Sequence, residues 1–176
     1  FGGDLLGNLW RFDLAAATGS TAAKVAVLQN GSGQAQPVTV APELASFSGQ
    51  RVVMLGTGRM LDVTDWGVNQ VQTLYAIADG STLTNVRSSL VQQTYTGHTT
   101  DTITAASADW ATQRGWYMDL PAGEHANTQP AYADGILAVV TNKAGRTDCS
   151  ASSYLYVLAG STGAGGCLHV WRDMVE

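Results

Sequence analysis

Apolar residues along this chain gather in short runs, which are separated by glycine and polar turn residues. One pattern occurs four times: a short apolar strand with an aromatic residue, followed by a carboxylate or a glycine turn. The aromatic positions are 65, 41 and 40 residues apart, and they are Trp10, Tyr75, Trp116 and Tyr156. A strand repeat near 40 residues is typical of β-propeller blades. The pattern therefore predicts an all-β fold, a β-propeller.

The repeats place four blade motifs along the chain, near residues 1–28, 36–79, 90–120 and 130–160. Blades pack face to face, and a large aromatic side chain at each interface removes about 150–250 Å² from water. We therefore interpret the four aromatic residues as blade-packing side chains.

The remaining segments fit this interpretation. Further strands are expected at 24–28, 51–59 and 90–95, and the Asp134-Gly135 pair predicts a tight turn between two strands. Two prolines within 36–43 suit an edge or a connecting strand. The best candidate for a helix is 81–92.

Chain length raises the question of completeness. At about 40–45 residues per blade, 176 residues make about four blades. Propellers close with four to eight blades, and an open arc would leave apolar blade faces bare. We therefore expect residues 1–176 to be a partial propeller domain whose remaining blades lie outside this chain, which starts at Phe1 rather than at a methionine.

Composition and charge exclude two classes of partner. Charged residues make up 13% of the chain, the net charge is −5, and the basic residues are scattered. Nucleic-acid binding needs a clustered positive face, so it is not expected. The longest clean apolar run is 136–140, which is far too short to span a bilayer.

Two cysteines, Cys149 and Cys167, lie 18 positions apart on either side of an expected strand. This spacing suits a disulfide that closes a hairpin-like loop, and it also suits two free buried thiols. A disulfide would indicate an oxidising compartment.

Residues that could carry chemistry do not form a recognisable constellation. The stretch 56–61 begins like a dinucleotide loop but lacks the third glycine, so a turn is expected. Asp62 and Asp65 supply too few oxygens for calcium, so a surface loop is expected there. The histidines lie on separate segments, at His98, His125 and His169. No catalytic, cofactor-binding or metal-binding residue is assigned.

Six segments, in register, resemble the PilY/PilC family of type IV pilus tip adhesin and biogenesis proteins. The first is Gly3–Leu14, with the sequence GDLLGNLWRFDL, and the fifth is RGWYMDLP, followed by Gly123-Glu124. The other four are 36–43, 55–65, 72–77 and 148–156.

The resemblance implies a C-terminal propeller with quinoprotein-like blades in a large secreted Gram-negative protein. Its expected partners are minor pilins, the pilus tip complex and the host cell surface, and its expected roles are pilus assembly, adhesion and twitching motility. The expected location is extracellular or at the cell surface: the pilus tip, the outer membrane or the periplasm. The resemblance also favours the disulfide between Cys149 and Cys167. It places the family's calcium loop upstream of Phe1, so no cofactor is expected within this chain.

These expectations favour a non-enzymatic module over two alternatives. A quinoprotein dehydrogenase would need a quinone, calcium and ligands contributed by most blades, and this sequence shows no such set. A scaffold for outer-membrane protein assembly would bind exposed strands by edge pairing.

Overall fold

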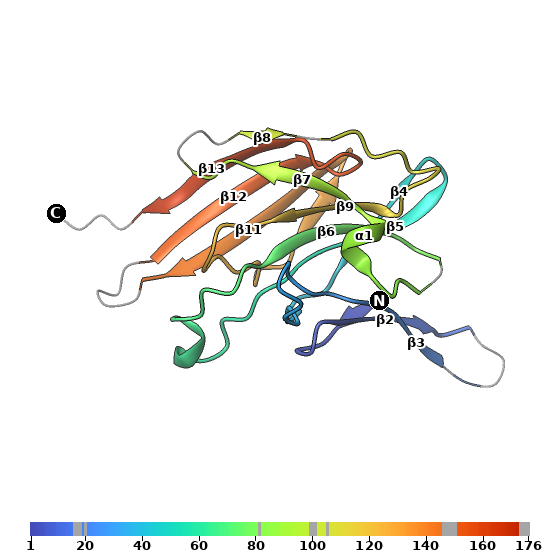
Figure 1. Cartoon of the computed structure of the whole chain (residues 1–176), viewed down its shortest axis with the longest axis horizontal. Helices are drawn as coiled ribbons and strands as arrows, with labels where there is room; N and C mark the ends of the chain where they lie inside the picture. Colours follow the sequence, from blue (N-terminus) through green and yellow to red (C-terminus); the bar gives the residue numbers. More distant parts are fainter. Residues whose placement is uncertain are drawn as a thin grey trace.

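The described residues form three β-sheets, which are stacked face to face (Figure 1). The computed structural model describes residues 1–15, 19, 21–80, 82–98, 102–104, 106–145 and 151–172. The first sheet has three antiparallel strands, in the order β1 (Gly2–Gly3), β2 (Asn8–Asp13) and β3 (Thr21–Val27).

The central sheet has six strands in the order β4-β5-β6-β9-β7-β8. Neighbouring strands run antiparallel except β7 and β9, which run parallel. The bounds are β4 (Glu43–Phe47), β5 (Gln50–Gly56), β6 (Thr73–Ala78), β7 (Val91–Tyr95), β8 (Ile103–Thr104) and β9 (Gly115–Asp119).

The third sheet is an antiparallel meander of four consecutive strands. They are β10 (Ala131–Ala133), β11 (Ile136–Ala144), β12 (Ala151–Ala159) and β13 (Gly165–Arg172). The predicted turn joins β10 to β11, with positive φ at Asp134 and at Gly135. This backbone matches the twist of a tight hairpin.

Helices are short in the described part of the chain. A single turn of 3-10 helix, η1 (Val63–Asp65), follows β5, and α1 (Val86–Ser89) lies within the predicted helical segment 81–92. The described residues contain no helix that is long and apolar enough to cross a membrane.

Both faces of the central sheet are buried, so all six residues of β6 are shielded from solvent. On β6, Tyr75 packs in a core shared with the first sheet, whereas Leu74 and Ala76 pack in a core shared with the third. Successive side chains of a strand point to opposite faces, so one apolar strand serves both cores. We call the contact with the first sheet the first interface and the contact with the third sheet the second interface.

The arrangement of strands differs from the predicted arrangement of blades in one respect. Segments 36–79 and 90–120 were expected as separate blades, yet β6 and β9 are hydrogen-bonded neighbours, with Ala76 opposite Trp116. The structure therefore has three sheets where about four blades were expected. Both β6 and β9 are buried on both faces, so a buried aromatic residue does not reveal a strand's place within its sheet.

In the first copy of the aromatic motif, the side chain of Asp4 accepts several hydrogen bonds. Its Oδ1 accepts backbone N–H groups of Leu6 and Asn8, both at 2.9 Å, and its Oδ2 accepts the indole N–H of Trp10 at 3.0 Å. Burial alone would raise the pKa of Asp4, but these hydrogen bonds outweigh it and lower the pKa to about 2. Gly7 has a φ of 76°, a conformation that favours glycine. Asp4 thus fixes the turn between β1 and β2.

Candidate functional site

Buried polar side chains form two hydrogen-bonded groups, one at each interface, and each group includes a residue from the connector between two sheets. Two tyrosines, Tyr75 on β6 and Tyr156 on β12, are both 0% exposed. Each donates its hydroxyl to a connector residue that is also 0% exposed: Gln36 in the first interface and Glu124 in the second. We call these groups the Gln36 cluster and the Glu124 cluster.

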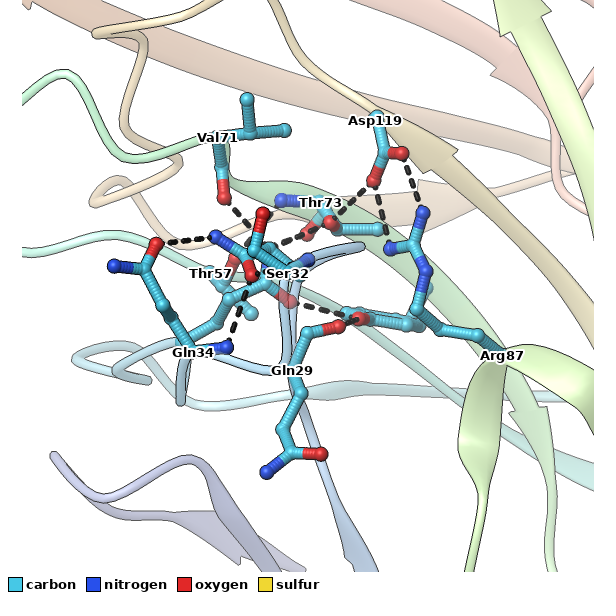
Figure 2. Close-up of polar contacts among 11 residues, drawn as sticks. Gln29, Ser32, Gln34, Thr57, Val71, Thr73, Arg87 and Asp119 are labelled. Atoms are coloured by element: carbon cyan, nitrogen blue, oxygen red, sulfur yellow. Dashed lines mark hydrogen bonds and ion pairs between the residues drawn. The ribbon is translucent and has the colours of Figure 1, made fainter.

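In the Gln36 cluster, one amide side chain serves three partners. Gln36 Oε1 accepts the Tyr75 hydroxyl at 2.7 Å. Gln36 Nε2 donates to the carbonyl of Val71 at 2.8 Å and to Thr73 Oγ1 at 2.7 Å (Figure 2). Burial raises the pKa of Tyr75 to about 12, so its hydroxyl remains a donor at neutral pH.

The Gln36 cluster extends outward to an ion pair, as Figure 2 shows. Thr73 Oγ1 donates to Asp119 at 2.8 Å, and Arg87 donates to both oxygens of Asp119, at 2.9 and 2.5 Å. The Arg87 guanidinium also lies 4.2 Å from the centre of the Tyr117 ring. Burial by itself lowers the pKa of Arg87, but the bonds and charge of Asp119 outweigh it and raise that pKa. The forked ion pair therefore fixes α1 against the central sheet.

A hollow of about 530 Å³ lies beside this ion pair, between the loop 29–33 and residues 84–88. Asn30 holds the loop, because its Oδ1 accepts the backbone N–H groups of Ser32 and Gln34. Since Asp119 already neutralises Arg87, the hollow offers neutral amide and hydroxyl groups.

In the Glu124 cluster, one buried carboxylate has three neighbours that can donate. Glu124 Oε2 accepts the hydroxyls of Tyr156 and Thr141, at 2.9 and 2.8 Å. Glu124 Oε1 lies 2.5 Å from His98 Nε2. Burial, followed by the charge of Glu124, raises the pKa of Tyr156, so this hydroxyl also stays protonated.

His98 links this carboxylate to further side chains. Its ring is stacked on Tyr154, with centroids 3.5 Å apart, and its Nδ1 lies 2.7 Å from the Tyr95 hydroxyl and 3.7 Å from Cys167 Sγ. A thiol, an imidazole and a carboxylate in series are also found in cysteine hydrolases. Here Cys167 is 2% exposed and packs in the core of the second interface, so a substrate has no access to the sulfur.

Three of the four aromatic residues that the sequence predicts as blade-packing side chains are completely buried. Tyr75, Trp116 and Tyr156 are completely buried, whereas Trp10 is half-buried and bonds Asp4. The disulfide between Cys149 and Cys167 stays a prediction, because Cys149 lies outside the described residues.

The predicted polar residues occupy different places. Asp62 is exposed, whereas Asp65, expected on a surface loop, is 2% exposed and paired with Arg59. His125 is buried, and it does not belong to the Glu124 cluster that contains His98. The side chain of His169 lies outside the described part of the structure.

Sequence reasoning assigned no role to Gln36, Glu124 or His98. A signal for the first two exists, because each lies seven residues before the first strand of its sheet. A polar residue lies at the same place in two connectors, and the third strand after each connector carries a buried tyrosine, Tyr75 on β6 and Tyr156 on β12. This repetition indicates a repeated hydrogen bond. His98 has no such signal, because it meets Glu124 only through the fold.

The stacked sheets, buried on both sides of the central one, define a fragment of a β-propeller. Residues 1–113 match the family model described as the PilY1 beta-propeller domain. The chain belongs to this family.

Relatives and a solved structure agree with this assignment. Two type IV pilus biogenesis factor PilY1 homologs of Xylella fastidiosa are 28% and 30% identical, over 93% and 97% of this chain. Type IV pilus biogenesis factor PilY1 of Pseudomonas aeruginosa is 31% identical over 68% of the chain. The chain spans only 13–15% of the length of these relatives.

The crystal structure of the Pseudomonas aeruginosa PilY1 C-terminal domain matches with a TM-score of 0.74. The match covers 91% of this chain and 43% of the other, at 24% identity. This likeness shows the propeller-type fold.

Proposed function

We propose that this chain is a non-enzymatic propeller module of a type IV pilus biogenesis factor, located at the cell surface or in the periplasm. The observation that carries the proposal is the family match over residues 1–113. The pilus biogenesis factors of Xylella fastidiosa and Pseudomonas aeruginosa, matched over most of this chain, support it.

The arrangement of the polar clusters supports a scaffold rather than a catalyst. The Gln36 amide and the Glu124 carboxylate are enclosed and bonded to neighbouring side chains. Enclosed and satisfied networks make a core rigid and specific. We propose that this rigidity positions surface loops that contact minor pilins in the pilus tip complex, and thereby supports pilus assembly, adhesion to host cells and twitching motility.

Deletion and complementation of the full-length gene test the proposal. We expect the deletion strain to lose surface pili and twitching, and the wild-type gene to restore both. Unchanged piliation and twitching in the deletion strain would contradict the proposal. Quinone absorbance in the purified protein, or dye reduction with alcohols, would contradict the non-enzymatic assignment.

A further inference from the structure

We infer that a hollow between the loop 59–68 and the adjacent ends of β11 and β12 binds a sugar ring that carries a carboxylate. The loop contains η1, which lies on the same side of the molecule as these strand ends (Figure 1). None of the lining residues belongs to the Gln36 cluster or to the Glu124 cluster. The inference therefore goes beyond the proposed function. We call this place the Trp66 hollow.

The Trp66 hollow has room for one sugar ring. Its volume is about 360 Å³, and sites for small molecules have volumes of about 300–1,000 Å³. Met60 and Trp66 line it from the loop, Asn127 lines it from the connector before β10, and Lys143 and Ser152 line it from β11 and β12. Among the described residues that line the hollow, Lys143 alone is charged. An apolar wall with a few polar groups is typical of a ligand site.

A tryptophan supplies a flat surface in this hollow. Trp66 is 50% exposed, although it is held in place from behind. Its backbone N–H donates to the carbonyl of Val63, at the end of η1, and a capping box of Asp62 and Asp65 fixes the start of η1. The face of an indole ring is negative, so it attracts the weakly positive C–H groups on one side of a sugar ring.

A lysine supplies an unpaired positive charge. Lys143 is exposed, and it makes no ion pair or hydrogen bond with any residue that the structure describes. By contrast, four arginines are each paired with an aspartate: Arg11, Arg51, Arg59 and Arg87. A free cation in the wall of a hollow is complementary to an anionic ligand. The charge of Lys143 therefore favours a sugar with a carboxylate over a neutral sugar.

An asparagine adds hydrogen-bond donors beside this charge. Asn142 Nδ2 donates to Asn127 Oδ1 at 2.8 Å and to Thr128 Oγ1 at 3.2 Å, and Asn142 Oδ1 accepts the hydroxyl of Ser153 at 2.8 Å. These bonds hold the oxygen of Asn127, so the N–H₂ group of this half-buried side chain is left to donate. Ammonium and amide donors suit the carboxylate and hydroxyl oxygens of an acidic sugar.

Other ligands fit the Trp66 hollow less well. A nucleotide or another phosphate-rich ligand needs several cations or a helix N-terminus, and the hollow offers one lysine. Membrane loops need a basic surround, which is also missing among the described lining residues. An extended protein segment binds through a free strand edge, whereas Ala144 of β11 already pairs with Ala151 of β12. A compact ring with one negative charge matches what remains.

Saturation-transfer NMR of the full-length protein with three small molecules tests this inference. We expect glucuronate to bind at millimolar concentrations, as is usual for a ligand of this size, and glucose to bind more weakly because it lacks the charge. Acetate lacks the ring and should not bind. An oligosaccharide that ends in glucuronate distinguishes the two sources of this sugar. Tighter binding than that of glucuronate assigns the hollow to a polysaccharide, and weaker binding assigns it to the free sugar.

Two variants locate the binding in the Trp66 hollow. Trp66→Ala should weaken binding of glucuronate about tenfold or more, because the stacking surface is lost. Lys143→Met keeps the apolar stem and removes the charge. It should weaken binding about threefold to fivefold and abolish the preference for glucuronate over glucose.

Phe12→Ala and Lys24→Met are the matched controls. Phe12 is 50% exposed and Lys24 is exposed, and both lie on the first sheet, outside the hollow. Both controls should bind glucuronate as the wild type does. All four variants should unfold at the wild-type temperature, so that a change in binding reports the contact with the ligand.

Four outcomes would overturn the inference. They are no binding of glucuronate to the wild type, equal binding by the wild type, Trp66→Ala and Lys143→Met, binding of acetate as tight as that of glucuronate, and displacement of glucuronate by a lower concentration of a short acidic peptide. The last outcome would assign the hollow to a protein segment. Pilus counts and twitching of the deletion strain decide the proposed function independently of these results.

Discussion

The two interfaces of the central sheet use the same device with different chemistry. In each, a fully buried tyrosine donates to a connector residue seven positions before the first strand of a sheet, but that residue is Gln36 in one interface and Glu124 in the other. The surrounding groups explain the difference. Gln36 faces one donor, Tyr75, and two acceptors, the Val71 carbonyl and Thr73 Oγ1. An amide offers both an acceptor and donors, which suits this environment.

Glu124 faces the hydroxyls of Tyr156 and Thr141 and the Nε2 of His98. A carboxylate offers two acceptor oxygens and no donor, which suits this environment. The comparison teaches that the fold fixes where a polar connector residue is needed, whereas its neighbours fix which residue can serve.

Glu124→Gln should have the largest effect. The new amide would direct an N–H₂ group at donors and remove the charge that holds three partners. We expect a loss of about 3–5 kcal/mol in the free energy of unfolding, measured by urea denaturation of the full-length protein. A variant as stable as the wild type would show that the carboxylate is not needed.

Gln36→Glu is the reciprocal change. It keeps the acceptor for Tyr75 but loses both donated bonds, and it places a charge beside the Val71 carbonyl. We expect a loss of about 2–4 kcal/mol in the same denaturation experiment. Equal stability would mean that the first interface does not discriminate between amide and carboxylate. Gln34→Glu, outside the buried core of the cluster, is the control.

Removing the two hydroxyls tests the tyrosines directly. Tyr156→Phe leaves a buried carboxylate with one donor fewer, and we expect a loss of about 2–3 kcal/mol in the free energy of unfolding. Tyr75→Phe leaves a neutral amide oxygen, which still lies in the cluster, and should cost about 1–2 kcal/mol. The reverse order would contradict the difference in charge between the interfaces. Tyr132→Phe, at a partly buried position, is a suitable control.

Alkaline pH tests the same two hydroxyls without a mutation, and it sharpens the comparison. The pKa of Tyr75 rises from 10.0 to about 12 in the folded state, and the pKa of Tyr156 also rises. A group with a raised folded pKa stabilises the fold fully below its unfolded pKa and loses this stabilisation as the pH rises through the folded pKa. The free energy of unfolding should therefore fall between pH 10 and 12, and less steeply in either phenylalanine variant. Identical slopes in wild type and variants would contradict burial of these hydroxyls.

The sequence predicts the strands better than it predicts their neighbours. Repeated apolar strands with aromatic residues predict the all-β architecture, and the Asp134-Gly135 turn is confirmed. The same pattern could not distinguish β9 from a strand of a new blade, because Trp116 has the environment of a blade core although its strand pairs with β6.

The polar clusters were harder to predict, because their members meet only in the fold. His98 and Glu124 are 26 residues apart, and Gln36 and Tyr75 are 39 apart. Gln36 and Glu124 appeared in the sequence only as parts of family motifs. Their burial depends on sheets that pack across them, which no local pattern reveals.

A pair of double-mutant cycles tests the central claim most directly. One cycle combines Glu124→Gln with Tyr156→Phe, and the other combines Gln36→Leu with Tyr75→Phe, both in the full-length protein under urea denaturation. The account predicts coupling in both cycles, about 1–3 kcal/mol, with the larger value at the charged pair. Additive effects in either cycle would contradict the claim that these tyrosines and connector residues hold the two interfaces together.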